Sequence, residues 1–317
     1  MMKYKKIPGI NLPVSNIIFG CCNPILIRDE NGGEALLDLA YRHGFNTFDT
    51  AKVYGKSESV LGRWIKSAGI RDKVIIISKG CHPDPAPRLS AAALREDVES
   101  SISRLQTEYI DRYMLHRDDP DADIDEVLDV LNLYMKQGTI RKIGVSNWKH
   151  DRIEEVNKRA TDKGMEGFTV SSPQLSPARQ VGDPWGGGCV SISYDDKALS
   201  WYEDHPEIPV FAYSCLGHGV FSGKLNTKIP FLAKRSLDGA AREGFWCKEN
   251  INRLKVAEDI AKQKGCGVAA IAIAWCMAHG FPVFPIVTVS SEDRIKKNLE
   301  SLDISLSDED VARLNKG

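Results

Sequence analysis

The amino-acid sequence predicts an α/β protein whose eight parallel strands and intervening helices close into a (β/α)8 TIM barrel. Short apolar, strand-like runs alternate with segments of helical periodicity along the whole chain. Near-continuous apolar strands between amphipathic helices are typical of a parallel sheet that helices cover. An open, doubly wound sheet is the alternative, but no GxGxxG motif follows the first strand, where a dinucleotide-binding fold would carry one.

The expected elements follow one another in a regular order. The eight expected strands are IIFGC (17–21), FNTFD (45–49), KVIIIS (73–78), YIDRYML (109–115), RKIGVS (141–146), FTVSS (168–172), IPVFAYS (208–214) and FPVFPIV (281–287). Helices are expected over 30–44, 58–69, 90–106, 124–138, 151–164 and 195–205, as a pair near 247–279, and over 292–302. Several of these helices end at a glycine, as helices often do: Gly44, Gly138 and Gly164.

Three further segments complete the expected architecture. Residues 3–15 read as two short strands around Pro8-Gly9, an N-terminal β-hairpin across the bottom of the barrel. Two segments rich in glycine or lacking regular periodicity, 176–196 and roughly 215–246, form extended loops after strands 6 and 7. Loops after barrel strands border the active site, so we expect both to line a ligand cleft. No linker divides the chain, and residues 1–317 are expected to form a single domain.

Composition narrows the class of protein. The chain has 42 basic and 43 acidic residues and a formal charge of -1, without the basic stripe of a nucleic-acid-binding protein. Its eight cysteines form no CxxC pair, which favours free thiols in an intracellular protein. The N-terminus lacks a secretory h-region, and the apolar segment 268–278 is about half the ~20 residues that a membrane span requires. We therefore expect a cytoplasmic protein with no nucleic-acid or membrane partner.

Four polar side chains stand where consecutive apolar runs end. Asp49 and Tyr54 follow one strand in FNTFDTAKVYG, Lys79 ends the next in KVIIISKG, and His116 ends the third in YIDRYMLHRDDP. Each alone has an ordinary structural reading, as a turn residue, a rim aromatic or a buried histidine. Because active sites of parallel barrels collect at the C-terminal ends of the strands, we expect the four groups to converge in one pocket.

These residue types suit proton transfer to an oxygen atom. A tyrosine is a poor acid at neutral pH, with an ordinary pKa near 10, and a nearby ammonium group would lower that value. An aspartate can hold the lysine in place, and a histidine can hydrogen-bond the substrate or tune the tyrosine. Such a set could protonate an oxygen while negative charge develops on it, as carbonyl reduction requires.

At this level of detail the chain closely resembles the aldo-keto reductase superfamily. The matching segments are DTAKVYG (49–55), SKG (78–80), LHRDDP (115–120), GTIRKIGVSNW (138–148), AYSCLGHGVFSGKL (212–225) and VSSEDRIKKNLES (289–301). The resemblance runs nearly from end to end. It implies a (β/α)8 barrel that binds an extended NADP(H) molecule and transfers hydride to aldehydes or ketones, without a metal.

The resemblance also implies roles for individual residues. Tyr54 would be the general acid, Lys79 and Asp49 would depress its pKa, and His116 would orient the substrate carbonyl. The implied cofactor contacts are Ser146, Asn147 and Gln174 for the nicotinamide carboxamide, Tyr213 for stacking on the nicotinamide ring, Ser214, Leu216, Gly217 and Gly219 for the pyrophosphate, and Ser290, Ser291, Arg294 and Asn298 for the adenosine end.

The chain departs from the family pattern at several positions. Thr288 stands where many members have lysine, and Lys297 where many have an acidic residue. The adenosine site is therefore altered, and NADP(H) is expected with NAD(H) as the alternative. Cys215 occupies a position where proline is common. After Gln174 the usual aromatic residue is missing and a glycine-rich insertion follows within 182–193, so this wall of the cleft differs from the common one.

The leading hypothesis is an NAD(P)H-dependent aldo/keto reductase that acts on a small carbonyl or alcohol substrate. The runner-up is a nucleotide-binding barrel that acts as a redox-sensing or regulatory subunit with little turnover. A metal-dependent hydrolase is disfavoured because most of the histidines fall on helices and loops. Five side chains are expected near the cleft and would suit a sugar-like or otherwise hydroxylated carbonyl: His82, Arg117, Asp118, Trp148 and Trp185.

Overall fold

Eight parallel strands close into a barrel in the computed structural model, which describes residues 1–84, 86–225, 227 and 234–317. Their order around the barrel follows the sequence, and the last strand pairs with the first. The strands are β3 (Ile18–Gly20), β4 (Thr47–Asp49), β5 (Ile75–Gly80), β6 (Ile110–Leu115), β7 (Ile140–Ser146), β8 (Ser171–Ser172), β9 (Val210–Ala212) and β10 (Val283–Val287). This confirms the (β/α)8 prediction and all eight expected strands.

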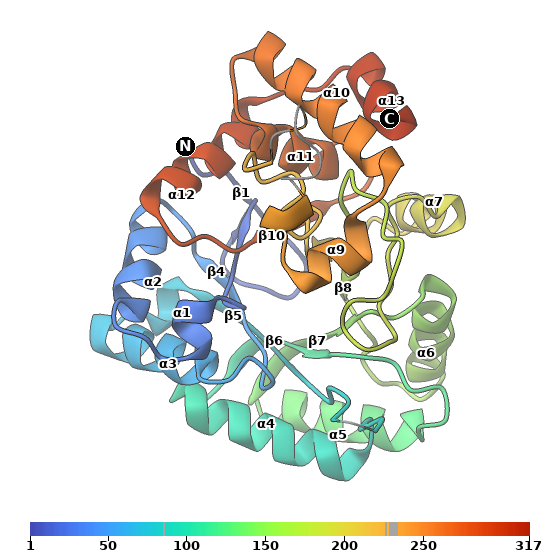
Figure 1. Cartoon of the computed structure of the whole chain (residues 1–317). Coiled ribbons are helices and arrows are strands. Elements are labelled where there is room, and N and C mark those ends of the chain that lie inside the picture. Colours follow the sequence, from blue (N-terminus) through green and yellow to red (C-terminus); the bar gives the residue numbers. More distant parts are fainter. Residues whose placement is uncertain (85, 226, 228–233) are drawn as a thin grey trace.

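Helices surround the strands (Figure 1). They are α1 (Pro24–Ile27), α2 (Gly33–Arg42), α3 (Ser57–Ala68), α4 (Ala91–Leu105), α5 (Ile124–Lys136), α6 (His150–Asp162), α7 (Asp196–Asp204), α9 (Gly239–Phe245), α10 (Lys248–Lys264), α11 (Val268–Met277), α12 (Glu292–Leu299) and α13 (Asp308–Lys316), with 3-10 turns at Arg71–Lys73 and Glu300–Asp303. Every expected helix is present, with ends shifted by a few residues. The short helices α1, α9 and α13 were not anticipated.

Local sequence signals explain where α4 begins and ends. The hydroxyl of Ser90 accepts a hydrogen bond from the backbone N–H of Ala93, which satisfies one of the free donors at the helix N-terminus. Leu94 and Val98 are fully buried, as their spacing predicted. The helix ends at Gln106, whose backbone turns into the left-handed region at φ 50°. Asp97 lies on the same buried face, so this helix also turns a carboxylate toward the barrel.

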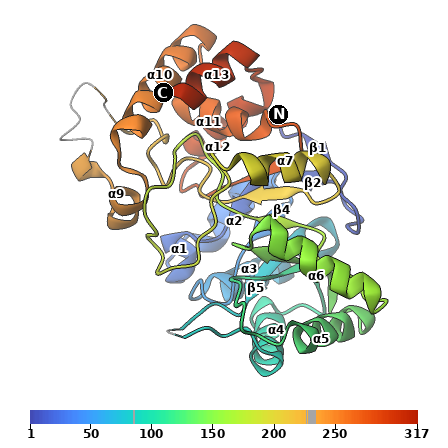
Figure 2. The ribbon, with the colours of Figure 1, turned by 90° about the vertical axis from the view of Figure 1, so that its right-hand side faces the viewer.

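The N-terminal hairpin closes one end of the barrel. Strands β1 (Tyr4–Lys5) and β2 (Val14–Ser15) pair antiparallel, as predicted. Apolar side chains of the hairpin, including Ile10, pack into the barrel interior against residues of the surrounding strands. The guanidinium of Arg112 donates to the carbonyl of Pro8 at 3.2 Å and so ties β6 to the hairpin. In Figure 2 the hairpin lies on the right, opposite α1, α9 and the yellow-green loop that precedes α7.

The apolar segment near 268–278 forms α11, and its residues 269–276 are buried within the protein. This confirms its interpretation as a core helix. None of the helices in the described ranges is both long and apolar enough to cross a bilayer. All eight cysteines are free thiols, as their spacing predicted.

The close approach of α3 to α4 depends on Gly62. A Cβ atom at this position would lie 2.4 Å from the backbone oxygen of Leu105. We predict that Gly62→Ala forces the two helices apart and destabilises the protein by about 1–3 kcal/mol, the usual cost of overpacking. The urea midpoint measures this effect. Gly239→Ala in α9 is the control, since a Cβ there meets nothing within 4 Å. Equal midpoints for the two variants would contradict the close-packing argument.

Candidate active site

The structure brings the four predicted proton-handling residues together at the C-terminal end of the barrel. Asp49 is the last residue of β4, Lys79 lies near the end of β5, and His116 directly follows β6. Tyr54 stands in the loop between β4 and α3. Its ring centroid lies 5.8 Å from that of His116 and 5.1 Å from the Lys79 Nζ atom. The four side chains therefore share one site, as their order along the strands predicted.

Lys79 and Asp49 form a buried ion pair. The Nζ atom of Lys79 lies 2.7 Å from each carboxylate oxygen of Asp49, and it also donates to the backbone oxygen of Thr50 at 3.0 Å. Both side chains are almost fully excluded from solvent. Burial raises the pKa of the Asp49 carboxyl, and the charge of Lys79 opposes this shift. The pair thus fixes the lysine next to the Tyr54 ring.

The pKa of the Tyr54 phenol lies well above its ordinary value of about 10. Burial is the main cause, Cys22 and Asp49 act in the same direction, and Arg117 opposes them. This direction is opposite to the lowering that the sequence led us to expect from Lys79. The physical reason is that burial penalises the phenolate, while Asp49 already balances the lysine charge. A protonated Tyr54 is a hydrogen-bond donor ready to face an oxygen atom.

His116 is neutral at ordinary pH. Burial lowers its pKa well below 6.5, and the charge of Lys79 adds to this effect. The ring of His82 meets it edge-on at 4.7 Å between centroids. The Nδ1 atom of His116 is buried and has no hydrogen-bond partner among the described residues. A neutral imidazole with an unpartnered nitrogen can donate to or accept from a ligand, depending on its tautomer.

The amide of Asn147, at the end of β7, is fully engaged by protein groups. Its Nδ2 atom donates to Ser146 Oγ at 3.0 Å and to the His116 carbonyl at 3.3 Å. Its Oδ1 atom accepts from the Tyr213 hydroxyl at 2.6 Å and from the backbone N–H of Val190 at 3.2 Å. Three of the predicted cofactor residues therefore lie side by side, and the glycine-rich loop reaches them.

Gln174 shows the same pattern after β8. Its Oε1 atom accepts hydrogen bonds from Ser191 at 2.5 Å and Ser193 at 3.1 Å, and its Nε2 atom donates to Ser176 at 2.7 Å. The ring of Trp185, in the glycine-rich part of the loop, packs edge-on against Tyr213 at 5.8 Å. The loop after β8, the sixth strand of the barrel, therefore borders the site, as predicted. It also hydrogen-bonds to Asn147 and Gln174, which the resemblance assigns to the nicotinamide.

The segment after β9 forms a tight turn. Four of its residues have left-handed backbone conformations: Ser214, Gly217, His218 and Gly219. The turn also includes Leu216, and a hydrogen bond from Cys215 Sγ to the Ile286 carbonyl at 3.3 Å holds it beside β10. A Cβ atom at Gly219 would meet nothing within 4 Å, so its backbone faces open space. Of the expected loop over 215–246, residues 226 and 228–233 lie outside the described residues.

The predicted adenosine residues gather at the start of α12. Ser291 caps the helix by accepting from the Arg294 N–H at 3.4 Å, and the Arg294 guanidinium donates to Ser290 Oγ at 3.1 Å. Asn298 is buried one turn further along the helix. Lys297 pairs with Asp293 at 2.8 Å, so a local carboxylate balances its charge.

Not every residue expected at the cleft lies there. His82 packs against His116, and Trp185 packs against Tyr213, so both border the site. Trp148 instead is 1% exposed and packs edge-on against Phe168. Asp118 lies 3.7 Å from the Arg152 guanidinium, which directs it toward α6. Aromatic and acidic residues next to a barrel strand end serve packing as readily as binding, and the sequence alone did not separate the two.

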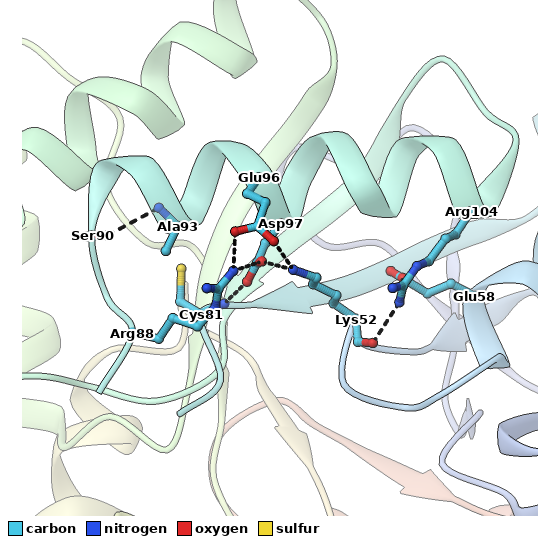
Figure 3. A network of polar contacts seen from close by, with 9 residues as sticks. All are labelled: Lys52, Glu58, Cys81, Arg88, Ser90, Ala93, Glu96, Asp97 and Arg104. Carbon is cyan, nitrogen blue, oxygen red and sulfur yellow. Dashed lines mark hydrogen bonds and ion pairs between the residues drawn. The ribbon is translucent and has the colours of Figure 1, made fainter. Parts of the chain in front are cut away.

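A buried carboxylate that the sequence analysis did not single out joins the segments next to Tyr54 and Lys79 (Figure 3). Asp97 of α4 accepts a hydrogen bond from the Cys81 N–H at 2.7 Å, two residues beyond Lys79. Its other oxygen binds the side chains of Lys52, two residues before Tyr54, and of Arg88. One signal was present in the sequence, because Asp97 precedes Val98 on the apolar face of the helix. An acid on such a face usually has a structural partner.

A second set of contacts extends this network along α3 and α4. The buried carboxylate of Glu58 accepts from the Ser78 hydroxyl at 2.6 Å, next to Lys79 in β5. Arg104 lies 3.7 Å from Glu58 and donates to the backbone oxygen of Lys52 at 3.0 Å. Figure 3 shows Arg104 and Asp97 reaching the same loop from one helix. Polar side chains of α4 thus fix the segment that carries Tyr54.

Comparisons with known proteins identify the family. The family model described as "Aldo/keto reductase family" matches residues 29–316. The chain belongs to the aldo/keto reductase family. It is thus a member of a family of oxidoreductases.

Relatives cover nearly the full length of this aldo/keto reductase. "Protein tas" of Escherichia coli (strain K12) is 28% identical over 99% of this chain and 96% of its own length. The "Uncharacterized oxidoreductase YrpG" of Bacillus subtilis (strain 168) is 25% identical over 99% of the chain and 95% of its own length. The "Probable voltage-gated potassium channel subunit beta" of Arabidopsis thaliana is 26% identical, with 96% and 92% covered.

The role of Asp97 can be tested through stability. The pKa of Asp97 is lowered in the folded protein, where Lys52, the Cys81 N–H and Arg88 outweigh burial. Its carboxylate therefore stabilises the fold above the ordinary carboxyl pKa of about 4, and this contribution is lost as pH falls through the lowered value. We predict that Asp97→Asn destabilises the protein by about 1–3 kcal/mol at pH 7, because Lys52 and Arg88 lose their buried carboxylate partner and keep only the exposed Glu96.

The difference in urea midpoint between wild type and Asp97→Asn should begin to shrink below about pH 4, where the carboxyl group of the unfolded chain becomes protonated, and should disappear below the lowered pKa of the folded protein. Glu96 contacts the same two cations from the exposed side, and Glu96→Gln is the matched control with little expected effect. A midpoint difference that stays constant into the acid range would show that Asp97 acts through packing rather than charge.

Proposed function

We propose that this aldo/keto reductase reduces an aldehyde or ketone to the alcohol, with NADPH as hydride donor and Tyr54 as general acid. The observation that carries the proposal is the convergence of Tyr54, neutral His116 and the buried Lys79–Asp49 pair in one site. A phenol that burial keeps protonated can donate to a carbonyl oxygen as negative charge develops there.

Each residue of the site has a distinct part in this proposal. Tyr54 donates its proton to the carbonyl oxygen. The ammonium group of Lys79, which Asp49 keeps 5.1 Å from the centre of the Tyr54 ring, favours the phenolate that forms when the proton leaves. His116 positions the carbonyl through its imidazole ring, which meets the Tyr54 ring edge-on. The cofactor, when bound, supplies the hydride.

The residues between β7 and α12 fit an extended dinucleotide. Asn147, Gln174 and Tyr213 follow β7, β8 and β9, and Arg294 lies beyond β10, so the predicted contacts occupy four neighbouring strands in order. The turn at Gly219 exposes backbone with no side chain over it, which suits a pyrophosphate. Arg294 at the start of α12 has a serine hydroxyl as partner and can turn its fork to a 2′-phosphate.

Binding a nicotinamide carboxamide here requires an exchange of hydrogen bonds. Asn147 has its four hydrogen-bonding positions filled, and Gln174 has both acceptor positions filled by loop serines. A carboxamide offers one acceptor and two donors, so it can replace Val190 on Asn147 or Ser191 on Gln174 at similar enthalpy. We infer that the glycine-rich loop shifts when the cofactor binds.

The side-chain amides of Asn147 and Gln174 already hydrogen-bond to the loop, which also favours a second candidate function, a nucleotide-binding regulatory subunit with little turnover. One relative is itself named a probable channel subunit. A single-turnover experiment separates the two functions. NADPH-loaded protein mixed with an aldehyde should lose nicotinamide absorbance within seconds if it is a reductase, and should keep it if cofactor binding serves regulation alone.

Tyr54→Phe tests the general acid. This change keeps the ring and removes the donor, so carbonyl reduction should fall by a factor on the order of 10² to 10⁴. NADPH affinity, measured by fluorescence titration, should hardly change. Tyr4→Phe at the opposite end of the barrel is the control and should leave the rate unaltered. Near-normal turnover in Tyr54→Phe would remove Tyr54 from the proposed role.

Arg294→Ala tests cofactor choice. A hydrogen bond to a charged group contributes roughly 1.5–3 kcal/mol, or about one to two decades in affinity. Wild type should therefore bind NADPH modestly tighter than NADH, and the variant should lose this preference while NADH affinity stays nearly constant. Lys297→Ala is the control, because Asp293 already balances that lysine. Equal weakening of both cofactors in Arg294→Ala would overturn the phosphate contact.

A further inference from the structure

Arg117 is a buried cation at the edge of the candidate active site. It directly follows His116 at the end of β6, and it is 7% exposed. One guanidinium nitrogen donates to the His116 carbonyl at 3.2 Å, and another lies 3.4 Å from the sulfur of Cys189 in the glycine-rich loop. Among the described residues Arg117 forms no ion pair with a carboxylate, although the chain forms many such pairs elsewhere.

Neither neighbour of Arg117 supplies a negative charge. Burial raises the pKa of the Cys189 thiol to about 11, so the sulfur is neutral near pH 7. The nearby carboxylate of Asp183 accepts from the backbone N–H groups of Cys189 at 3.1 Å and Trp185 at 3.4 Å. Asp118, the next residue along the chain, lies against Arg152 instead.

The guanidinium group of Arg117 therefore has no carboxylate in direct contact with it among the described residues. Asp49 and Lys79 neutralise each other, His116 is neutral, and Asp183 is separated from Arg117 by Cys189. An arginine stays protonated in proteins, and burying such a charge without an opposite one is costly. A ligand could supply the counter-charge at this position beside His116, because the planar fork of arginine matches a carboxylate or a phosphate.

We propose that the substrate is a carbonyl compound carrying an anionic group, a carboxylate or a phosphate, and that Arg117 binds this group and determines specificity. The inference rests on the proposed reductase function. The anion would lie close to the reacting carbonyl, since Arg117 is bonded to the backbone of His116, whose ring faces Tyr54. It is distinct from the cofactor phosphates, whose predicted contacts follow β9 and β10 on another part of the barrel rim.

Matched substrate pairs test the proposal. Succinic semialdehyde is compared with its methyl ester, and glyceraldehyde 3-phosphate with glyceraldehyde, by the initial rate of NADPH oxidation. We expect kcat/KM of the charged member to exceed that of its neutral partner about ten- to a hundred-fold in at least one pair. The pair that shows the preference distinguishes a carboxylate from a phosphate.

Variants assign that preference to Arg117. In Arg117→Gln the charged-to-neutral ratio should fall close to one, and Arg117→Lys should restore part of it. The ratio compares two substrates in one protein, so a general loss of activity leaves it unchanged. Arg152→Gln is the control, because Asp118 and Glu155 already balance Arg152. Its ratio should match that of wild type.

A binding measurement covers the case in which none of these carbonyls is reduced. With NADPH saturating, succinate or inorganic phosphate should raise the melting temperature of wild type and not that of Arg117→Gln. Anion binding through Arg117 without any carbonyl turnover would count against the proposed reductase and keep the anion site. Reduction of neutral and charged partners at equal efficiency, or a ratio retained in Arg117→Gln, would overturn the anion site and keep the reductase.

Discussion

The ion pair between Lys79 and Asp49 is the interaction on which the arrangement of the candidate site depends. Two charges that are nearly excluded from water are stable only next to each other. Their contact requires β4 and β5 to be neighbours and in register, and β5 in turn sets the position of β6 and His116. The orientation of the Tyr54 ring, 5.1 Å from Lys79, follows from the same constraint.

A second layer of buried charge keeps this pair in place from outside the barrel. Asp97 and Glu58 belong to helices, yet they bind β5, the loop before Tyr54 and the segment after Lys79. In this layer each carboxylate has a cation or several donors as partners. Arg117 differs, since it has the burial of a structural residue without the carboxylate partner of one. Arg112 and Arg253 are also buried without an ion pair among the described residues, but they donate to protein oxygen atoms outside the candidate site. The position of Arg117 beside His116 is what separates it from them.

The sequence predicted the barrel, its eight strands and the four proton-handling residues because each depends on local pattern and strand order. Asp49, Lys79 and His116 end consecutive apolar runs. The C-terminal ends of all strands in a parallel barrel lie at the same face, so these residues must lie near one another. The direction of the Tyr54 pKa shift could not be predicted, since it depends on how deeply the ring is buried. Trp148 was misplaced because a pattern does not reveal which face of a strand end its side chain takes.

The contacts of the glycine-rich loop could not be predicted from the sequence. Glycines at 186–188 permit left-handed backbone, but nothing in GDPWGGGCVS indicates that Val190 and Ser191 reach Asn147 and Gln174. Such contacts between a loop and distant strand ends depend on tertiary packing. The same holds for α9, whose seven residues carry too little periodicity to stand out.

The candidate site divides between two halves of the barrel, with the proposed proton-transfer groups at the ends of β4 to β6 and the proposed nucleotide contacts at and beyond the ends of β7 to β10. A hydrogen bond from Asn147 to the His116 carbonyl joins the halves. Substitutions far apart and without shared partners usually have additive effects, whereas those in one network do not. If the proposed roles hold, changes around α12 would alter which nucleotide is accepted and leave proton transfer intact. The two properties could then diverge separately in evolution, except at Asn147, where a single replacement would disturb both.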